Sequence, residues 1–181
     1  MSKKRVLDTC CFINFQAAGC AGELLLACGG PVSIPEAVKR EALYLAPAVL
    51  DEPRVRVDND AVISELKLEV IAPATDAEVE LYVSLATELD DGEAMGLALA
   101  KARGLVLLTD ERKARRKAAS FGVEVLTTPD VVRAWSDGVD EARVVEVIRN
   151  IGKAARYVPS PKEEHYGWWV KRAGKDSPRT S

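Results

Sequence analysis

Short apolar runs alternate with amphipathic stretches along most of the chain, which is the pattern of a parallel sheet covered by helices. The strand-like runs are residues 5–7, 31–34, 105–108 and 123–126. Between them, apolar residues recur at helical spacing, with glycine, proline and capping residues at the ends. The expected helices are residues 9–17, 23–28, 35–45, 75–87, 90–103, 111–120, 129–135 and 140–155. The pattern predicts an α/β fold, a three-layer α/β/α sandwich with a central, mainly parallel sheet.

The middle of the chain has a different texture. Residues 54–58 and 66–71 alternate apolar and polar positions in a strand-like way. Pro53 and Pro73 lie at the outer ends of these two runs. Proline often marks the boundary of an element, so we expect an extra hairpin here beside the main sheet.

The length of 181 residues, 48% of them hydrophobic, suits one well-buried domain rather than two. Residues 153–181 differ from the rest, because seven lysine or arginine residues there outnumber three acidic ones, and tyrosine and tryptophan gather among them. We therefore expect a main domain at residues 1–152 and a basic, aromatic C-terminal tail at 153–181. Such a tail can pack on the domain, contact nucleic acid by stacking and phosphate pairing, or bind a partner.

Charge and cysteine usage narrow the class of protein. The net charge of −3 argues against holding nucleic acid by bulk positive potential, so any such contact must be local. The four cysteines lack the paired spacing of zinc sites and have only His165 for company, which favours small buried thiols in a reducing cytosol. Asp8 interrupts the first apolar run, and no apolar run reaches about 18 residues. A cytoplasmic protein without a membrane span is expected.

Acidic side chains occupy two strand ends. Asp8 directly follows the strand at residues 5–7, and Asp110 follows the strand at 105–108 and Thr109. Carboxyl ends of parallel strands share one edge of the sheet, which is where open α/β sheets bind ligands. Taken singly, either aspartate also fits the simpler role of a helix N-cap.

Two further carboxylates fall on apolar helix faces. Glu41 shares a face with Val38 and Leu45, and Glu93 shares one with Leu97 and Ala100. A buried carboxylate needs a partner, a proton or a metal ion, although a place at the rim of the apolar stripe is the alternative. Together with the two aspartates, these residues offer the hard oxygen ligands that Mg²⁺ or Mn²⁺ prefers.

Four segments carry a family resemblance. VLDTCCFINF, IPEAVKREAL, LDDGEAMGLALA and LVLLTDERKARRKAASFGVEVL follow one another along the chain. In this order they resemble the PIN-domain ribonucleases over residues 5–135, and within them the solitary prokaryotic PIN proteins, including VapC-type toxins. The resemblance implies a PIN-like fold and a Mg²⁺- or Mn²⁺-dependent endoribonuclease that acts on RNA. It also implies a homodimer and, for a toxin, a small antitoxin that places a cationic segment in the acidic pocket.

The resemblance assigns roles position by position. The four acidic residues implied as catalytic metal ligands are Asp8, Glu41, Glu93 and Asp110. Asp91 competes with Glu93, and Glu111 is a further candidate ligand. The polar neighbours implied to contact substrate are Thr9, Asn14 and Thr109.

Basic residues follow Asp110 closely. The candidates for holding the phosphates beside the cleaved bond are Arg112, Arg115 and Arg116, together with Lys113 and Lys117. Arg115 is preferred among them because it matches an arginine of the family. The alternative is a solvated helix face that binds nothing.

Rival functions and departures from the family remain open. A HAD-like phosphatase needs a second aspartate two residues after the first, and Cys10 stands there. The features of a receiver-type phosphoacceptor domain are not evident. A catalytically silent PIN scaffold that binds RNA or protein is the main alternative to the nuclease. Two features depart from the family pattern: Cys10 and Cys11 follow Asp8 and Thr9, and residues 47–73 and the chain beyond Gly152 exceed what a minimal PIN toxin needs.

Overall fold

The core of the computed structural model, which describes residues 2–40, 44–45, 55–56 and 58–174, is a five-stranded sheet. Its strand order is β5-β2-β1-β6-β7, and every neighbouring pair is parallel. The strands are β1 (Arg5–Leu7), β2 (Val32–Pro35), β5 (Glu69–Ile71), β6 (Val106–Leu108) and β7 (Val125–Leu126). A separate antiparallel pair joins β3 (Tyr44–Leu45) to β4 (Val55–Arg56).

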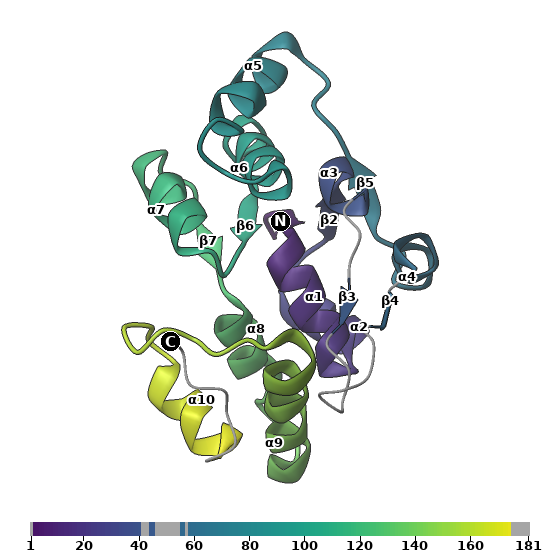
Figure 1. Ribbon diagram of the computed structural model, residues 1–181, viewed down its shortest axis with the longest axis vertical. Helices are drawn as coiled ribbons and strands as arrows, with labels where there is room; N and C mark the ends of the chain where they lie inside the picture. The colour runs from purple at the N-terminus through teal and green to yellow at the C-terminus, as the bar shows by residue number, and fades with distance from the viewer. Residues whose placement is uncertain (1, 41–43, 46–54, 57, 175–181) are drawn as a thin grey trace.

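Helices cover both faces of the sheet (Figure 1). One layer contains α1 (Thr9–Ala18), α2 (Ala21–Ala27), α8 (Thr128–Trp135), α9 (Glu141–Asn150) and α10 (Tyr166–Ala173). The other contains α5 (Asp76–Leu85), α6 (Asp91–Arg103) and α7 (Arg112–Ser120), with the short α3 (Glu36–Arg40) against α6. This arrangement confirms the predicted three-layer α/β/α sandwich.

The central strands are buried on both faces, which explains why they are almost continuously apolar. Val6 and Leu107 pack into the cluster formed with α6 and α7, while Leu7 and Leu108 pack into the cluster formed with α1 and α8. Successive side chains on a strand point to opposite faces, so each short strand contributes to both cores. The paired strands β1 and β6 therefore fix the ends from which Asp8 and Thr109 emerge.

The C-terminal segment packs on the domain as far as the structure describes it. Helix α9 continues into a π-helical turn, η1 (Ile151–Ala155), and the chain then reaches α10. Trp169 and Ala173 are buried in the same cluster as α1. The Tyr157 ring meets the Trp169 ring edge-on at 5.8 Å. The described part of the tail therefore packs on the domain through these side chains.

Two predictions for the middle of the chain are wrong. The helix expected at residues 35–45 is only α3, since Pro35 ends β2 and residues 44–45 form β3. The expected hairpin of residues 54–58 with 66–71 does not form, because β4 pairs with β3 and β5 joins β2 in the main sheet. Helix α4 (Asn59–Glu65) lies between them.

Local capping explains the missed helix. The Asp58 side chain accepts a hydrogen bond from Ala61 N at 3.1 Å and so caps α4, which buries Ile63. Lys67 then adopts a left-handed backbone with a φ of 52°, which turns the chain into β5.

No helix in the described ranges is long and apolar enough to cross a bilayer.

Candidate metal centre

The candidate site lies where the chain changes direction across the sheet. From β1 the chain moves outward through β2 to β5, and from β6 it moves to β7 on the other side. Leu7 is paired with Leu108, and the Asp8 backbone N–H donates to the Leu108 carbonyl at 3.1 Å. Asp8 and the Thr109–Asp110 pair therefore emerge side by side at the carboxyl edge, the position where such sheets bind ligands.

Asp8 has one engaged and one unengaged carboxylate oxygen. Its Oδ1 caps α1 by accepting from Cys11 N at 3.0 Å, and it also accepts from Cys10 Sγ at 2.9 Å. The side chain is 0% exposed, and its Oδ2 has no hydrogen-bond partner among the described residues. Burial raises the pKa of Asp8 to about 7. Asp8 can therefore cap α1 and also bind a metal ion, because the cap uses Oδ1 and leaves Oδ2 without a partner among the described residues.

A cavity of about 310 Å³ gathers further carboxylates around Asp8. Its lining residues are Asp8, Thr9, Cys10, Ile13, Asp90, Glu93 and Glu111. Burial, with Glu111 and Asp90 as negative neighbours, raises the pKa of Glu93 to about 7. Like charges in one partly buried cavity repel each other unless protons or a cation offset them.

Close packing of α6 on the sheet brings Glu93 to this edge. Gly96, one turn further along α6, lies so near the sheet that an added Cβ would sit 3.4 Å from Leu107 and 3.7 Å from Pro35. An alanine methyl group would make ordinary van der Waals contacts there, whereas a longer side chain would run into Leu107 and Pro35. The GEAMG sequence thus combines a carboxylate with the small residue that lets it approach the strands.

Asp110 has a different environment from Asp8. Its Oδ1 accepts from Thr128 N at 2.8 Å and from the Tyr157 hydroxyl at 3.2 Å. Its Oδ2 accepts from Asn14 Nδ2 at 2.8 Å, from Thr128 Oγ1 at 2.5 Å and from Cys11 Sγ at 3.4 Å. Burial raises the pKa of Asp110 while these hydrogen bonds oppose the rise. Asp110 is not among the residues that line the cavity, and it joins α1, α8 and the C-terminal segment.

The remaining candidates divide between these two environments. Glu111 lines the cavity, and its N–H donates to the buried Thr109 hydroxyl at 3.1 Å. Asp91 does not line it, and accepts instead from the Tyr82 hydroxyl at 3.2 Å. Asn14 belongs to the Asp110 network. Glu41 lies outside the described residues.

Sequence reasoning did not single out Asp90, Thr128 or Tyr157. Asp90 precedes α6 and was visible in the sequence as part of its acidic start. Thr128 and Tyr157 are 18 and 47 residues from Asp110, and no local pattern links them to it. Only the fold brings them to the carboxylate.

Several basic side chains of helix α7 already form ion pairs or hydrogen bonds within the protein. Arg115 pairs with Glu163 of the C-terminal segment at 2.9 Å, and Lys117 pairs with Glu88 at 2.8 Å. Lys113 donates to the Glu88 carbonyl. Arg112 and Arg116 are exposed, lie one turn apart, and have no ion-pair partner within the described ranges. These two arginines, rather than Arg115, are available to an external anion.

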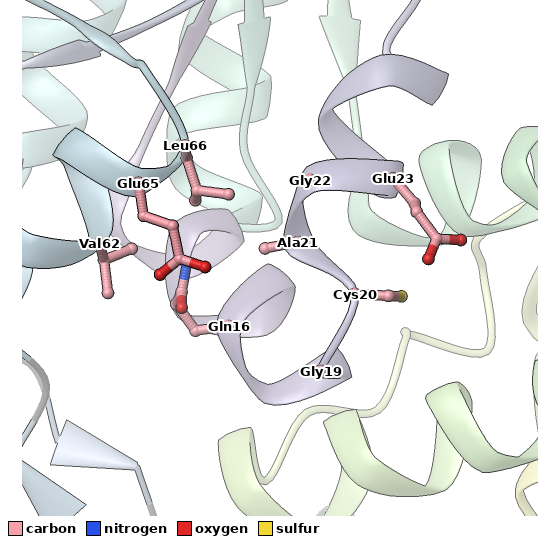
Figure 2. A pocket seen from close by; sticks show the side chains of 9 residues that line it. All are labelled: Gln16, Gly19, Cys20, Ala21, Gly22, Glu23, Val62, Glu65 and Leu66. Atoms are coloured by element: carbon pink, nitrogen blue, oxygen red, sulfur yellow. The ribbon is translucent and has the colours of Figure 1, made fainter.

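A second cavity, of about 390 Å³, lies between α1, α2 and α4 (Figure 2). Gln16, Cys20 and Glu65 are among its lining residues, and none of the predicted site residues is. The acidic cavity at the sheet edge is therefore the one that matches the sequence prediction.

Comparison with family models decides the classification, because a model described as a PIN domain matches residues 4–162. The chain belongs to the PIN-domain family. A search of curated proteins returned no match. The match extends past the resemblance at residues 5–135 and includes Tyr157, so the PIN domain takes in part of the C-terminal segment. PIN domains are generally nucleases that bind RNA and use divalent metals.

The donor set of this PIN domain fits a divalent cation. Asp8, Asp90, Glu93 and Glu111 line the cavity, and the Asp8 oxygen that has no hydrogen-bond partner would gain one from an ion bound there. Carboxylate oxygens are the ligands that Mg²⁺ and Mn²⁺ prefer. The carboxylate of Asp8 and the thiols of Cys10 and Cys11 also present ligand atoms within 4.8 Å of one another.

The raised pKa values predict how stability depends on pH. Asp8 and Glu93 have pKa values of about 7 in the folded protein against ordinary values of 3.8 and 4.5. The folded state therefore binds these protons more tightly, and their contribution to stability is lost as pH rises from about 4 to about 7. We expect Mn²⁺ to raise the Tm more at pH 8 than at pH 5, because it replaces the lost protons.

Thermal unfolding across this pH range, with and without Mn²⁺, measures the effect. Glu93→Gln should flatten the pH dependence of the metal-free protein, since it removes one of the two titrating groups. A metal-induced rise in Tm that is equal at both pH values would contradict the assignment.

Proposed function

We propose that this PIN domain is a divalent-metal-dependent endoribonuclease that hydrolyses RNA phosphodiester bonds. The observation that carries the proposal is the fully buried Asp8 carboxylate, one oxygen of which has no hydrogen-bond partner among the described residues, at a cavity that Asp90, Glu93 and Glu111 also line. Burying a carboxylate oxygen without a hydrogen-bond partner is costly, and such an oxygen at the ligand-binding edge of a sheet supports a functional role for it.

The chain's own residues would do three things. Asp8, Glu93 and Glu111 would hold the metal, with Asp90 beside them and Asp8 fixed by its cap on α1. When bound, the metal supplies an activated water and stabilises charge on the phosphate. The exposed Arg112 and Arg116, which follow Glu111 on α7, would orient the phosphates next to the scissile bond.

The experiment that tests the proposal is cleavage of a mixed structured RNA by the purified full chain with Mg²⁺, with Mn²⁺ and with chelator. Cleavage that requires metal and produces internal cuts supports the endoribonuclease. A protein that is inert in both metals on varied RNAs, yet still binds them, would replace the proposal with the silent scaffold.

The arginine pair yields a separate prediction. Arg112→Ala with Arg116→Ala should raise the KM for RNA about tenfold, with little change in kcat, because two phosphate contacts are lost. Steady-state kinetics at several salt concentrations should show a shallower salt dependence. Lys4→Ala is the matched control, since Lys4 is an exposed cation before β1, at the opposite edge of the sheet. Equal losses in both proteins would argue for a general charge effect instead.

Resemblance to the solitary prokaryotic PIN proteins extends the proposal to a toxin of a toxin–antitoxin pair. The antitoxin would place a cationic segment in the acidic cavity, where burial raises the pKa values of Asp8 and Glu93 and a cation would favour their ionised forms. The same resemblance favours a homodimer. A reducing cytoplasm suits four cysteines that are all free thiols.

A further inference from the structure

A thiol lies inside the acidic cavity. Cys10, the second residue of α1, lines the cavity with Asp8 and Glu93. Its sulfur is 2.9 Å from Asp8 Oδ1 and also accepts a hydrogen bond from Asp110 N at 3.2 Å. The helix start thus holds sulfur beside the carboxylate whose other oxygen is buried and unpartnered. A cation bound at the Asp8 carboxylate would therefore have a sulfur atom close to it as well as carboxylate oxygens.

The nearby Cys11 is placed differently. It is 0% exposed and does not line the cavity. Its sulfur donates to Asp110 Oδ2 at 3.4 Å and lies 3.6 Å from the Thr128 hydroxyl oxygen, so it belongs to the Asp110 network. Only Cys10 joins the carboxylates at the cavity wall.

Sulfur changes which cations such a site prefers. Mg²⁺ is a hard ion that binds oxygen and gains little from a thiol, whereas Zn²⁺ and Cd²⁺ bind thiolate strongly and also accept carboxylate oxygen. Zn²⁺ is further favoured over Mn²⁺ at mixed sites by the general order of divalent affinities. Coordination replaces the S–H bond by a sulfur–metal bond and releases the proton to solvent, with no change of oxidation state.

We propose that Asp8 and Cys10, whose ligand atoms lie within 4.8 Å of each other, form the core of a mixed oxygen–sulfur site at the cavity that Glu93 also lines, and that this site binds thiophilic divalent cations such as Zn²⁺ more tightly than Mg²⁺ or Mn²⁺. Zn²⁺ at this site competes with the hard cations and inhibits whatever activity they support. The inference shares with the proposed function only the premise that the cavity binds a divalent cation. It does not require RNA to be the substrate.

The decisive experiment is spectroscopic and uses the metal-free full chain. Co²⁺ titrated into the wild type should produce a thiolate-to-cobalt charge-transfer absorption, which one equivalent of Zn²⁺ abolishes and the same amount of Mg²⁺ does not. Cys10→Ser should lose this absorption and bind Zn²⁺ at least about tenfold more weakly by calorimetry. Serine can still donate to Asp8 Oδ1, so the helix start should stay intact, and circular dichroism checks that it does.

Cys20→Ser is the matched control. Cys20 is a partly buried thiol at the far end of α1, about 15 Å away, in the cavity of Figure 2. This variant should keep both the absorption and the Zn²⁺ affinity of the wild type. A wild type without the charge-transfer absorption, or an absorption that survives in Cys10→Ser, overturns the proposal, and the first of these results does not depend on any variant folding.

Failure of this inference can be told from failure of the proposed function. A Cys10-dependent cobalt absorption in a protein that cleaves no RNA keeps the mixed site and removes the nuclease. Metal-dependent cleavage without the absorption does the reverse. Where both hold, and with each protein measured against its own zinc-free rate, the Zn²⁺ concentration that halves Mg²⁺-supported cleavage should be at least about tenfold higher for Cys10→Ser than for the wild type.

Discussion

Asp8→Asn should abolish metal-dependent RNA cleavage, by at least about 100-fold, while leaving the protein folded. The substitution removes a carboxylate that has one oxygen without a hydrogen-bond partner among the described residues, yet an asparagine oxygen can still cap α1 through Cys11 N. It also removes a buried group with a pKa of about 7, so the metal-free variant should match or exceed the wild type in Tm at pH 8. Loss of activity together with retained or higher stability is expected for a group kept for function.

Cleavage assays and thermal unfolding, each with and without Mn²⁺, measure both parts. The variant should also lose the metal-induced rise in Tm. Asp58→Asn is the matched control, because Asp58 caps α4 in the same way as Asp8 caps α1 but lies outside the site. Undiminished cleavage by Asp8→Asn would remove the central ligand from the proposed site and with it the nuclease proposal in its present form.

Several elements of this fold could be predicted from the sequence because local rules govern them. Strand β6 was predicted within one residue, since valine and leucine side chains buried on both faces leave a continuous apolar run. Helix α6 was predicted from its acidic start and terminal Gly104, which adopts a left-handed backbone with a φ of 64°. The middle of the chain was misread because α4 has few buried residues, so its apolar periodicity is weak.

The candidate site was predictable only in part. Asp8 and Asp110 were placed at the sheet edge because parallel strands end there. Their different roles could not be predicted, because those depend on which donors the rest of the fold brings near. Thr128 and Tyr157 donate to Asp110 from distant elements, whereas Asp8 Oδ2 has no hydrogen-bond partner among the described residues. The sequence identifies candidate carboxylates, and the long-range hydrogen bonds distinguish them.

That distinction predicts a large stability effect at Asp110. Asp110→Ala should destabilise the protein by about 2–4 kcal/mol, because donors from Thr128, Asn14 and Tyr157 lose their shared acceptor. For a chain of this size the Tm should fall by about 5–15 °C. Asp110→Asn should also destabilise the protein. One carboxylate oxygen would become an amide nitrogen, whose N–H groups would face donors that now donate to that oxygen. Thermal unfolding of the metal-free proteins measures both effects.

Comparison with Glu111→Gln distinguishes an effect on stability from an effect on metal binding and cleavage. Glu111 is the next residue, is exposed and lines the cavity, so its amide should lower cleavage and Mn²⁺ affinity with little change in Tm. If Asp110→Ala kept the wild-type Tm but lost metal binding while Glu111→Gln remained fully active, Asp110 would be the ligand and the assignment of roles would be reversed. The expected result follows from the hydrogen bonds that each carboxylate already accepts. Both oxygens of Asp110 accept hydrogen bonds, so it gains less from a cation than Asp8, which has one oxygen without a partner among the described residues. Metal affinity in this PIN domain should therefore follow the number of unengaged carboxylate oxygens at the cavity wall.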